Sequence, residues 1–461
     1  MARPPFLPSL PGLLGFLLLT SLGPGCAHRP HNAPLPAYRP TEGYYFHTHP
    51  RPENSPEILC VLAFSGGGTR AAALSYGVLE ELRRTSIVVD GKPRRLLDEV
   101  DAISAVSGGS FTAAAYGLHG DAMFDIFPDA FLKRDVQKVL VWKTLNPFRW
   151  PKLLSSNWGR SDMAAAYYDQ ILFNNATFAD LEARPGPFIL INATDVNSGA
   201  RFSFTQMRFD FLCSDLSSYP LSRACAASSA VPGALSPITL DNYAGDCGFT
   251  PPQWILTPTN LPPRVRLLAR ELRQPLDRTN HPYLHLVDGG VSDNLGLREL
   301  LDDATIYRYT PEMRSRVDIA KLKRVVIISA NAYSDPERDW DRNESPPGSI
   351  ATAVAAAGHT LTRFSFETLE LLQQTLEDWK ERAGGQSDVQ FYPVMINFTN
   401  FKDPKDRRFY LNLPTSFVLP SPDVDRLVDA GSVLLRQNRE YLRFVADLGG
   451  TAATANTPPG P

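Results

Sequence analysis

The stretch SAVSGGSFTAAAYG, residues 104–117, joins the end of an apolar run to the start of an Ala-rich helix through one serine and two glycines. The run VDAISAV, residues 100–106, has the length and composition of a buried strand. Ser107 therefore lies at a strand-to-helix turn, with Gly108 and Gly109 directly after it. A sharp turn of this kind projects a serine hydroxyl above the sheet edge, close to helix N-terminal amides that favour negative charge.

Two interpretations of Ser107 are compatible with this turn. The usual signature of a nucleophilic serine is G-x-S-x-G, and here Ala105 replaces the first glycine. Alanine is the smallest substitute, so the sharp turn remains possible. The other interpretation is that Ser107 only caps the helix that follows it, as serine often does. On the turn alone, a nucleophile is the preferred interpretation.

A serine hydroxyl needs a base to become a nucleophile. His119, at the end of the helix that Ser107 begins, lies too far along it to turn back, and His359 is predicted within a helix. His281 and His285 precede a more suggestive stretch, HLVDGGVSDN, in which Asp288 ends an apolar strand and is followed by Gly289 and Gly290. Ligands of open α/β sheets bind at the carboxyl ends of strands, so Asp288 and Ser107 occupy the same kind of position. A turn-forming aspartate is the alternative.

A third motif is AFSGGGTRAAALSYG, residues 63–77, in which three glycines separate a strand from a helix. The backbone amides of Gly66, Gly67 and Gly68 can converge there on an anion. Neither the Lys-Ser/Thr ending of a phosphate-binding loop nor the spacing of a dinucleotide loop is present. Arg70 adds a positive charge just inside the helix.

The order of these three motifs resembles the patatin-like phospholipase family. The resemblance covers most of residues 57–300, including INATDVNSGARFSFT at residues 191–205 and ASSAVPGALSPITL at residues 227–240. It implies a three-layer α/β/α fold with a largely parallel sheet, and a catalytic Ser-Asp dyad without histidine. Ser107 would be the nucleophile and Asp288 the base.

The resemblance also assigns the supporting residues and the chemistry. The three glycines would form the oxyanion hole, and Arg70 would be the basic residue that follows it. Ser65 and Ala71 depart from the common family pattern, which suggests a divergent, bacterial, exported branch. The implied enzyme is a cofactor-free hydrolase of phospholipids, lysophospholipids or other carboxylic esters. An acyltransferase using the same site, or a catalytically silent envelope lipoprotein that binds lipid or a partner, is the alternative.

A carboxylate is a poor base for serine unless it is removed from water. We therefore expect an apolar pocket around Asp288, which would raise its pKa and also suit a fatty acyl chain.

Strand and helix patterns alternate along most of the chain. Apolar runs of strand length occupy residues 57–64, 100–106, 187–194, 284–290 and 322–330, and helical patterns occupy residues 69–84, 350–380 and 423–445. This alternation indicates a largely parallel sheet covered on both faces. We predict one α/β domain over residues 56–447, preceded by an extended, Pro- and His-rich leader at residues 26–55 and followed by a disordered tail at residues 448–461.

The composition excludes some classes of partner. The net charge is -3, with 46 Lys and Arg against 49 Asp and Glu spread along the chain. This balance leaves no basic stripe for a nucleic acid. No CxxC pair or Cys/His cluster indicates a metal site.

Residues 1–25 have the pattern of a secretory signal. Their apolar run LLGFLLLTSL, residues 13–22, is too short to span a bilayer, and small residues follow it up to Cys26. Cys26 is the residue that would be lipidated in a bacterial lipoprotein, and ordinary export with an incidental thiol is the alternative. We expect an exported protein of the cell envelope, anchored as a lipoprotein in the periplasm or outer membrane.

Export permits disulfides, and the four remaining cysteines allow three complete pairings. Cys213 and Cys247 lie in polar, loop-like contexts and are the preferred pair. Cys60 lies inside an apolar run and is expected to be buried and reduced.

Residues 141–160, VWKTLNPFRWPKLLSSNWGR, combine three of the six tryptophans with Phe148 and four basic residues. Aromatic and basic side chains together suit a lipid interface. They suit a packed cap over the core equally well, so both interpretations stay open.

Overall fold

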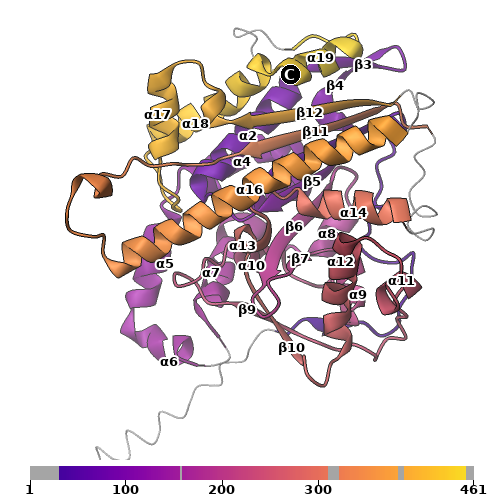
Figure 1. The fold of residues 1–461 in the computed structure, drawn as a ribbon. Helices are drawn as coiled ribbons and strands as arrows, with labels where there is room; N and C mark the ends of the chain where they lie inside the picture. The colour runs from indigo at the N-terminus through magenta and orange to yellow at the C-terminus, as the bar shows by residue number, and fades with distance from the viewer. Residues whose placement is uncertain (1–30, 156–157, 310–320, 383–388, 453–461) are drawn as a thin grey trace, which may run out of the picture.

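The computed structural model describes residues 31–155, 158–309, 321–382 and 389–452 (Figure 1). These residues form an eight-stranded sheet in the order β12-β11-β2-β5-β6-β10-β9, with β7 also paired to β6. The strands are β1 (Ala33–Pro34), β2 (Ile58–Phe64), β3 (Ser86–Val89), β4 (Lys92–Arg95), β5 (Val100–Val106), β6 (Phe188–Asp195), β7 (Arg201–Ser203), β8 (Ser214–Asp215), β9 (Ile238–Asp241), β10 (Tyr283–Asp288), β11 (Arg324–Asn331) and β12 (Gln390–Asn397).

Helices cover both faces of this sheet. They are α2 (Thr69–Arg84), α3 (Gly108–His119), α4 (Met123–Phe127), α5 (Val136–Leu145), α6 (Trp150–Leu153), α7 (Arg160–Tyr168), α8 (Phe178–Glu182), α9 (Gln206–Asp210), α10 (Leu221–Ser228), α11 (Gln253–Leu256), α12 (Pro263–Arg273), α13 (Gly290–Asp293), α14 (Arg298–Tyr309), α16 (Ser349–Arg382), α17 (Pro404–Asn412), α18 (Ser421–Gln437) and α19 (Arg439–Asp447).

The sheet is mixed but largely parallel. β12, β11, β2, β5 and β6 run parallel to one another, whereas β10 and β7 run antiparallel to β6, and β9 antiparallel to β10. In Figure 1, α16 and α14 cross in front of the sheet, and α2 lies behind it. The predicted three-layer α/β/α fold with a largely parallel sheet is confirmed.

The central strands follow directly from their apolar composition. Every residue of β5 is buried, and so is every residue of β2 except Leu59. Strands buried on both faces in this way lie at the centre of a parallel sheet covered by helices. The Ala-rich start of α2 lets that helix pack closely on α3 and on α18.

Two expectations about the chain ends are corrected by the structure. The single last helix predicted at residues 423–445 is two helices, because the Asn438 side chain accepts hydrogen bonds from the amides of Glu440 and Tyr441 and starts α19. The tail does not begin at residue 448, since Thr451 pairs with Ser86. Residues 453–461 lie outside the described part.

The leader predicted at residues 26–55 is not a free tether over its described part. β1 pairs with β8, and the buried ring of Tyr44 stacks on Phe188 at a centroid distance of 4.4 Å. The amide of Ile189, in β6, donates to the Tyr44 hydroxyl at 2.7 Å. Residues 31–55 therefore belong to the domain, because their aromatic side chains complete its core. No helix of the described residues is apolar enough over a sufficient length to cross a bilayer.

Candidate active site

Ser107 lies between β5 and α3 in a conformation that few L-residues adopt. Its φ is 49° and its ψ is -119°, a region that a non-glycine residue occupies only where the surrounding structure compensates the strain. The Ser107 hydroxyl does not cap α3. It donates instead to Oδ2 of Asp288 at 2.9 Å, while the Ser107 amide donates to Oγ of Ser228 at 2.8 Å. The helix-cap interpretation is therefore wrong for this side chain.

Close packing explains the two glycines after Ser107. A Cβ atom on Gly108 would lie 2.0 Å from the carbonyl oxygen of Gly68, and one on Gly109 would lie 2.8 Å from the carbonyl oxygen of Phe64. Only glycine fits at these distances. The N-terminus of α3 is thus packed directly against the glycine loop.

Strand register brings Asp288 to Ser107. Val106, at the end of β5, pairs with Asn192 of β6, and Asp288, at the end of β10, pairs with the next residue, Ala193. The two strands therefore end at consecutive positions of the same neighbour, although the two side chains are 181 residues apart in sequence. A close turn follows Asp288, and the Gly290 amide in this turn donates to the carboxylate.

The environment of Asp288 makes its carboxylate more basic than an ordinary aspartate. Its side chain is buried, and this burial raises its pKa from the usual 3.8 to about 6. The amide of Gly290, which donates to Oδ1 at 2.8 Å, and the Ser107 hydroxyl partly offset the rise. Gly289 makes this turn possible, since a Cβ atom there would lie 2.3 Å from a backbone oxygen of β6. Asp288 is thus ionised at neutral pH yet able to accept a proton.

The histidines lie elsewhere. His119 contacts the carbonyl oxygen of Leu172 at 3.1 Å, and Nδ1 of His285 is 2.9 Å from the hydroxyl of Thr239. Across the described ranges, no histidine is hydrogen bonded to Ser107, and no group of three His, Cys, Asp or Glu could hold a metal ion.

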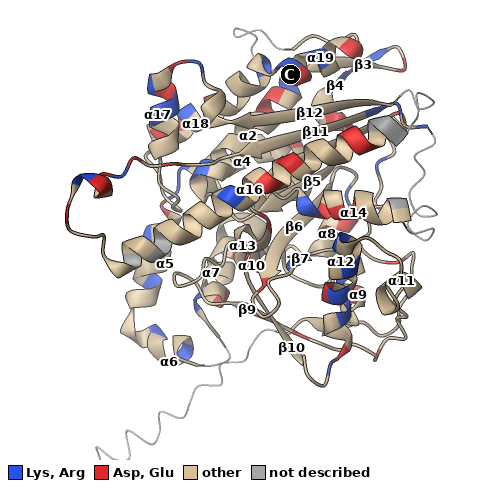
Figure 2. Ribbon diagram, in the orientation of Figure 1, with Lys and Arg blue, Asp and Glu red and all other residues tan. Residues whose placement is uncertain are grey.

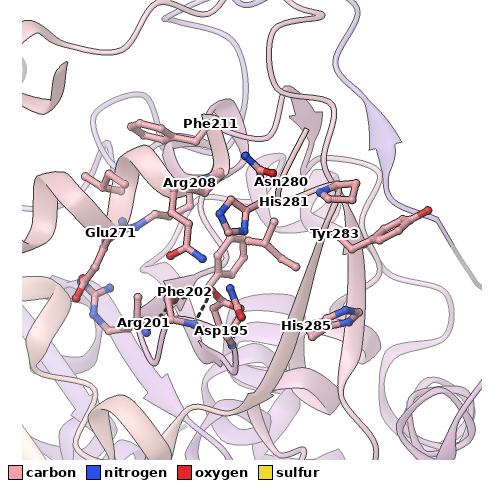
Figure 3. Close-up of a pocket in the computed structure, with 18 residues that line it drawn as sticks. Asp195, Arg201, Phe202, Arg208, Phe211, Glu271, Asn280, His281, Tyr283 and His285 are labelled. Atoms are coloured by element: carbon pink, nitrogen blue, oxygen red, sulfur yellow. Dashed lines mark hydrogen bonds between the residues drawn. The ribbon is translucent and has the colours of Figure 1, made fainter. Parts of the chain in front are cut away.

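His281 and His285 line a separate pocket of about 350 Å³ (Figure 3). Figure 3 shows His281 in the middle of its lining residues, with Asp195 and Phe202 close by. Neither Ser107 nor Asp288 lines this pocket. The apolar pocket expected around Asp288 is therefore not this one.

The glycine loop lies beside the serine, but its three amides are not equivalent. The Gly66 amide donates to the carbonyl oxygen of Asn294 at 3.0 Å, so the expectation that it faces an anion is wrong. Gly67 and Gly68 have φ values of 141° and 62°, which favour glycine. Within the described residues, no acceptor is hydrogen bonded to their amides. A Cβ atom on Gly66 would lie 3.4 Å from Cβ of Ser107, so the loop borders the hydroxyl.

Arg70 holds the segments that flank this loop. Its guanidinium donates to the carbonyl oxygens of Ala332 and Leu413 at 2.9 and 2.5 Å, and to the hydroxyl of Thr415 at 3.0 Å. The next residue along, Ser416, accepts the Thr69 amide at 2.8 Å. Burial lowers the pKa of Arg70 to about 10, and none of the described carboxylates pairs with it. Arg70 therefore ties the start of α2 to two other segments of the chain through two backbone oxygens and one hydroxyl.

We expect Arg70→Lys to lower kcat by about a hundredfold, the typical effect of misplacing an oxyanion donor. A lysine keeps the charge but cannot reach three acceptors at once. Arg223→Lys is the matched control, because Arg223 is also buried but pairs with Asp162, and it should lower only the melting temperature. Measuring kcat and melting temperature for both variants tests this role, and a purely thermal defect in Arg70→Lys would contradict it.

The structure joins Cys213 and Cys247 in a disulfide, with Cα atoms 5.4 Å apart. Cys60 and Cys225 are buried and free. Cys26 lies outside the described residues.

Two residues of the site were given no role by the sequence. Asn294 accepts the Gly66 amide through its backbone oxygen, and Ser228 accepts the Ser107 amide through its hydroxyl. Both belong to motifs that the sequence already marks, HLVDGGVSDN and ASSAVPGALSPITL. Each of them accepts an amide that is far away in the sequence, and the motifs alone do not indicate which amide that is.

Comparisons with known proteins agree with the order of these motifs. A family model described as patatin-like phospholipase matches residues 62–301. No curated protein matches the sequence. Human GIVD cytosolic phospholipase A2 is a structural neighbour, with 12% sequence identity and a TM-score of 0.44 over 86% of this chain. The chain spans 62% of the length of that protein. The same human enzyme in complex with methyl gamma-linolenyl fluorophosphonate has 14% identity and a TM-score of 0.41, over 86% of this chain and 59% of the other.

Proposed function

This chain belongs to the patatin-like phospholipase family, and we propose that it is a hydrolase of lipid esters that acts through Ser107 and Asp288 as a Ser-Asp dyad. The observation that carries the proposal is the 2.9 Å hydrogen bond from the serine hydroxyl to a buried carboxylate whose pKa is raised to about 6. A base of this strength adjacent to a serine on a strained turn is what nucleophilic catalysis needs.

The first half of the proposed reaction forms an acyl-enzyme. Oγ of Ser107 attacks the ester carbonyl carbon while Asp288 accepts the hydroxyl proton. The negative charge that develops on the carbonyl oxygen is stabilised by the amides of Gly67 and Gly68, each contributing about 3 kcal/mol when well placed. As the carbon–oxygen ester bond breaks, protonated Asp288 returns its proton to the departing alcohol. The acyl group is then bonded to Ser107.

The second half releases the acyl group. Water attacks the acyl carbon, and Asp288 again accepts a proton. The bond to Oγ breaks, Ser107 recovers its proton from Asp288, and a carboxylic acid leaves. An alcohol in place of this water would make the chain an acyltransferase, and the same two side chains serve both reactions.

A substrate panel separates these outcomes. Purified protein is incubated with a diacyl phospholipid, a lysophospholipid and a neutral short-chain ester, with and without an added acyl-acceptor alcohol. We expect free fatty acid from at least one lipid. Acyl transfer to the alcohol without free fatty acid would identify a transferase. No turnover of any ester, with no covalent labelling by a fluorophosphonate, would favour the catalytically silent alternative.

We also propose that the protein is exported and anchored through Cys26. The signal-like pattern of residues 1–25 supports this proposal, and so does the Cys213–Cys247 disulfide, because disulfides persist in oxidising compartments. The mass of the protein extracted from membranes distinguishes lipidated from merely cleaved Cys26.

A further inference from the structure

An exposed apolar surface lies on α5, α6 and the turn Pro147–Arg149 between them. We call it the α5–α6 surface. Its large apolar side chains are Val141, Trp142, Leu145, Phe148, Trp150 and Leu154. Phe148 is 92% exposed, Leu154 83% and Trp142 68%. These side chains are not a packed cap over the core, so the structure decides against that interpretation for residues 141–154.

Helical geometry explains why α5 has two apolar faces. Val136 and Leu140, four residues apart, point into the core and are buried. Val141, Trp142 and Leu145 occupy the opposite face and are exposed. The inward face anchors the helix, so the outward face is not needed for folding. Exposed apolar patches of this kind usually mark an interaction site.

The charge of this region has one sign. From residue 136 to residue 160 the sequence contains five Lys or Arg and no Asp or Glu, in a chain whose net charge is -3. Lys138, Arg149 and Lys152 are exposed, and none of them forms an ion pair with a described carboxylate. Figure 2 shows Lys and Arg positions in blue on α5 and α6.

We propose that the α5–α6 surface docks on an anionic phospholipid bilayer. The inference rests on the proposed function for the identity of the lipid as substrate. A bilayer offers apolar depth for Trp142, Phe148 and Leu154, and phosphate groups for the surrounding cations, whose stems lie along the apolar boundary. A second copy of this chain fits less well, because a two-fold symmetric contact would place the same cationic patch against itself.

The α5–α6 surface is connected to the catalytic loop by a short path. Gln137 of α5 exchanges two hydrogen bonds with Phe417, whose amide donates to the Gln137 side chain at 3.2 Å. Phe417 follows Ser416, which accepts the Thr69 amide directly after the glycine loop. The first turn of α5 is therefore hydrogen bonded to the segment that flanks the glycine loop.

The test measures vesicle binding in a Ser107→Ala background, so that lipid is not consumed. Vesicles of pure phosphatidylcholine are compared with vesicles of equal parts phosphatidylcholine and phosphatidylglycerol. Replacing Lys138, Arg149 and Lys152 with Gln should weaken binding to the anionic vesicles about a hundredfold at low salt, and much less at high salt. Trp142→Ser with Phe148→Ser should weaken it about tenfold or more.

Helix α12 supplies a matched control. Arg266, Leu267 and Arg270 are also exposed there, and replacing both arginines with Gln, or Leu267 with Ser, should leave vesicle binding unchanged. Equal loss in the α12 variants, or full binding by the α5–α6 variants, would overturn the proposal. So would a dimer in vesicle-free solution that Trp142→Ser with Phe148→Ser converts to monomer, because the occupant would then be a second copy.

The same samples separate this proposal from the proposed function. The α5–α6 variants, with Ser107 intact, should hydrolyse a water-soluble ester as fast as the wild type. Hydrolysis of that ester without any vesicle binding would contradict only the docking proposal. Vesicle binding without hydrolysis of any ester would contradict only the proposed function.

Discussion

Ser107→Ala is expected to lower kcat for ester hydrolysis by about 10⁴-fold or more, since removing the nucleophile abolishes the covalent route. Labelling by a fluorophosphonate probe should disappear in the same variant, because Ser107 Oγ is the atom that would be phosphonylated. Mass spectrometry of the labelled protein and initial rates on a soluble ester provide the two measurements.

Ser110→Ala is the matched control for Ser107→Ala. Ser110 lies one turn further along α3, is fully buried, and donates to the carbonyl oxygen of Ser107 at 2.6 Å. Its loss should reduce stability but leave labelling intact. Wild-type activity in Ser107→Ala, or labelling lost only in Ser110→Ala, would assign the nucleophile to another residue.

Asp288→Asn is expected to have a comparable effect on kcat, because an amide cannot accept the serine proton. In the wild type, kcat/KM should fall about tenfold per pH unit below about 6, as Asp288 becomes protonated. Asp293→Asn is the control, since Asp293 is also buried but bonds the amides of Leu295, Gly296 and Arg298 rather than the serine. The Asp293→Asn variant should be less stable than the wild type, but its folded fraction should retain the wild-type kcat. An unchanged kcat in Asp288→Asn would remove the base from the mechanism.

Asp288→Asn should also stabilise the fold at neutral pH. The pKa of Asp288 is raised in the folded state, from 3.8 to about 6, so the ionised carboxylate costs stability above pH 6. This difference corresponds to at most about 3 kcal/mol. The wild type should regain most of that stability as the pH falls from about 6 to about 4, because the folded-state carboxyl is then protonated while the unfolded-state carboxyl, with its usual pKa of 3.8, is only partly so. Denaturant unfolding of the wild type and of Asp288→Asn at pH 7 and pH 4 measures this difference in the free energy of unfolding. If Asp288→Asn were less stable than the wild type at pH 7, the ionised carboxylate would not destabilise the fold.

Much of the local structure could be predicted from short stretches of sequence. The strand at residues 100–106 and the helix at residues 69–84 have those bounds in the structure, because apolar runs and turn chemistry act over a few residues. The order of the glycine, Ser-Gly-Gly and Asp-Gly-Gly motifs was sufficient to identify the family. The strand ends alone marked Ser107 and Asp288 as candidates, and the family resemblance implied their roles as nucleophile and base.

Other features depend on contacts that no short stretch contains. The register of β5 and β10 on β6 decides that Asp288, and no described histidine, meets Ser107. The backbone oxygen of Asn294 accepts the Gly66 amide, which the glycine motif does not indicate. Whether residues 141–154 form a buried cap or an exposed surface depends on which face of α5 packs on the core, and the core contacts Val136 and Leu140 instead. Sequence determines which segments form strands, helices and turns, whereas partners far apart in the chain are selected only when the sheet aligns them.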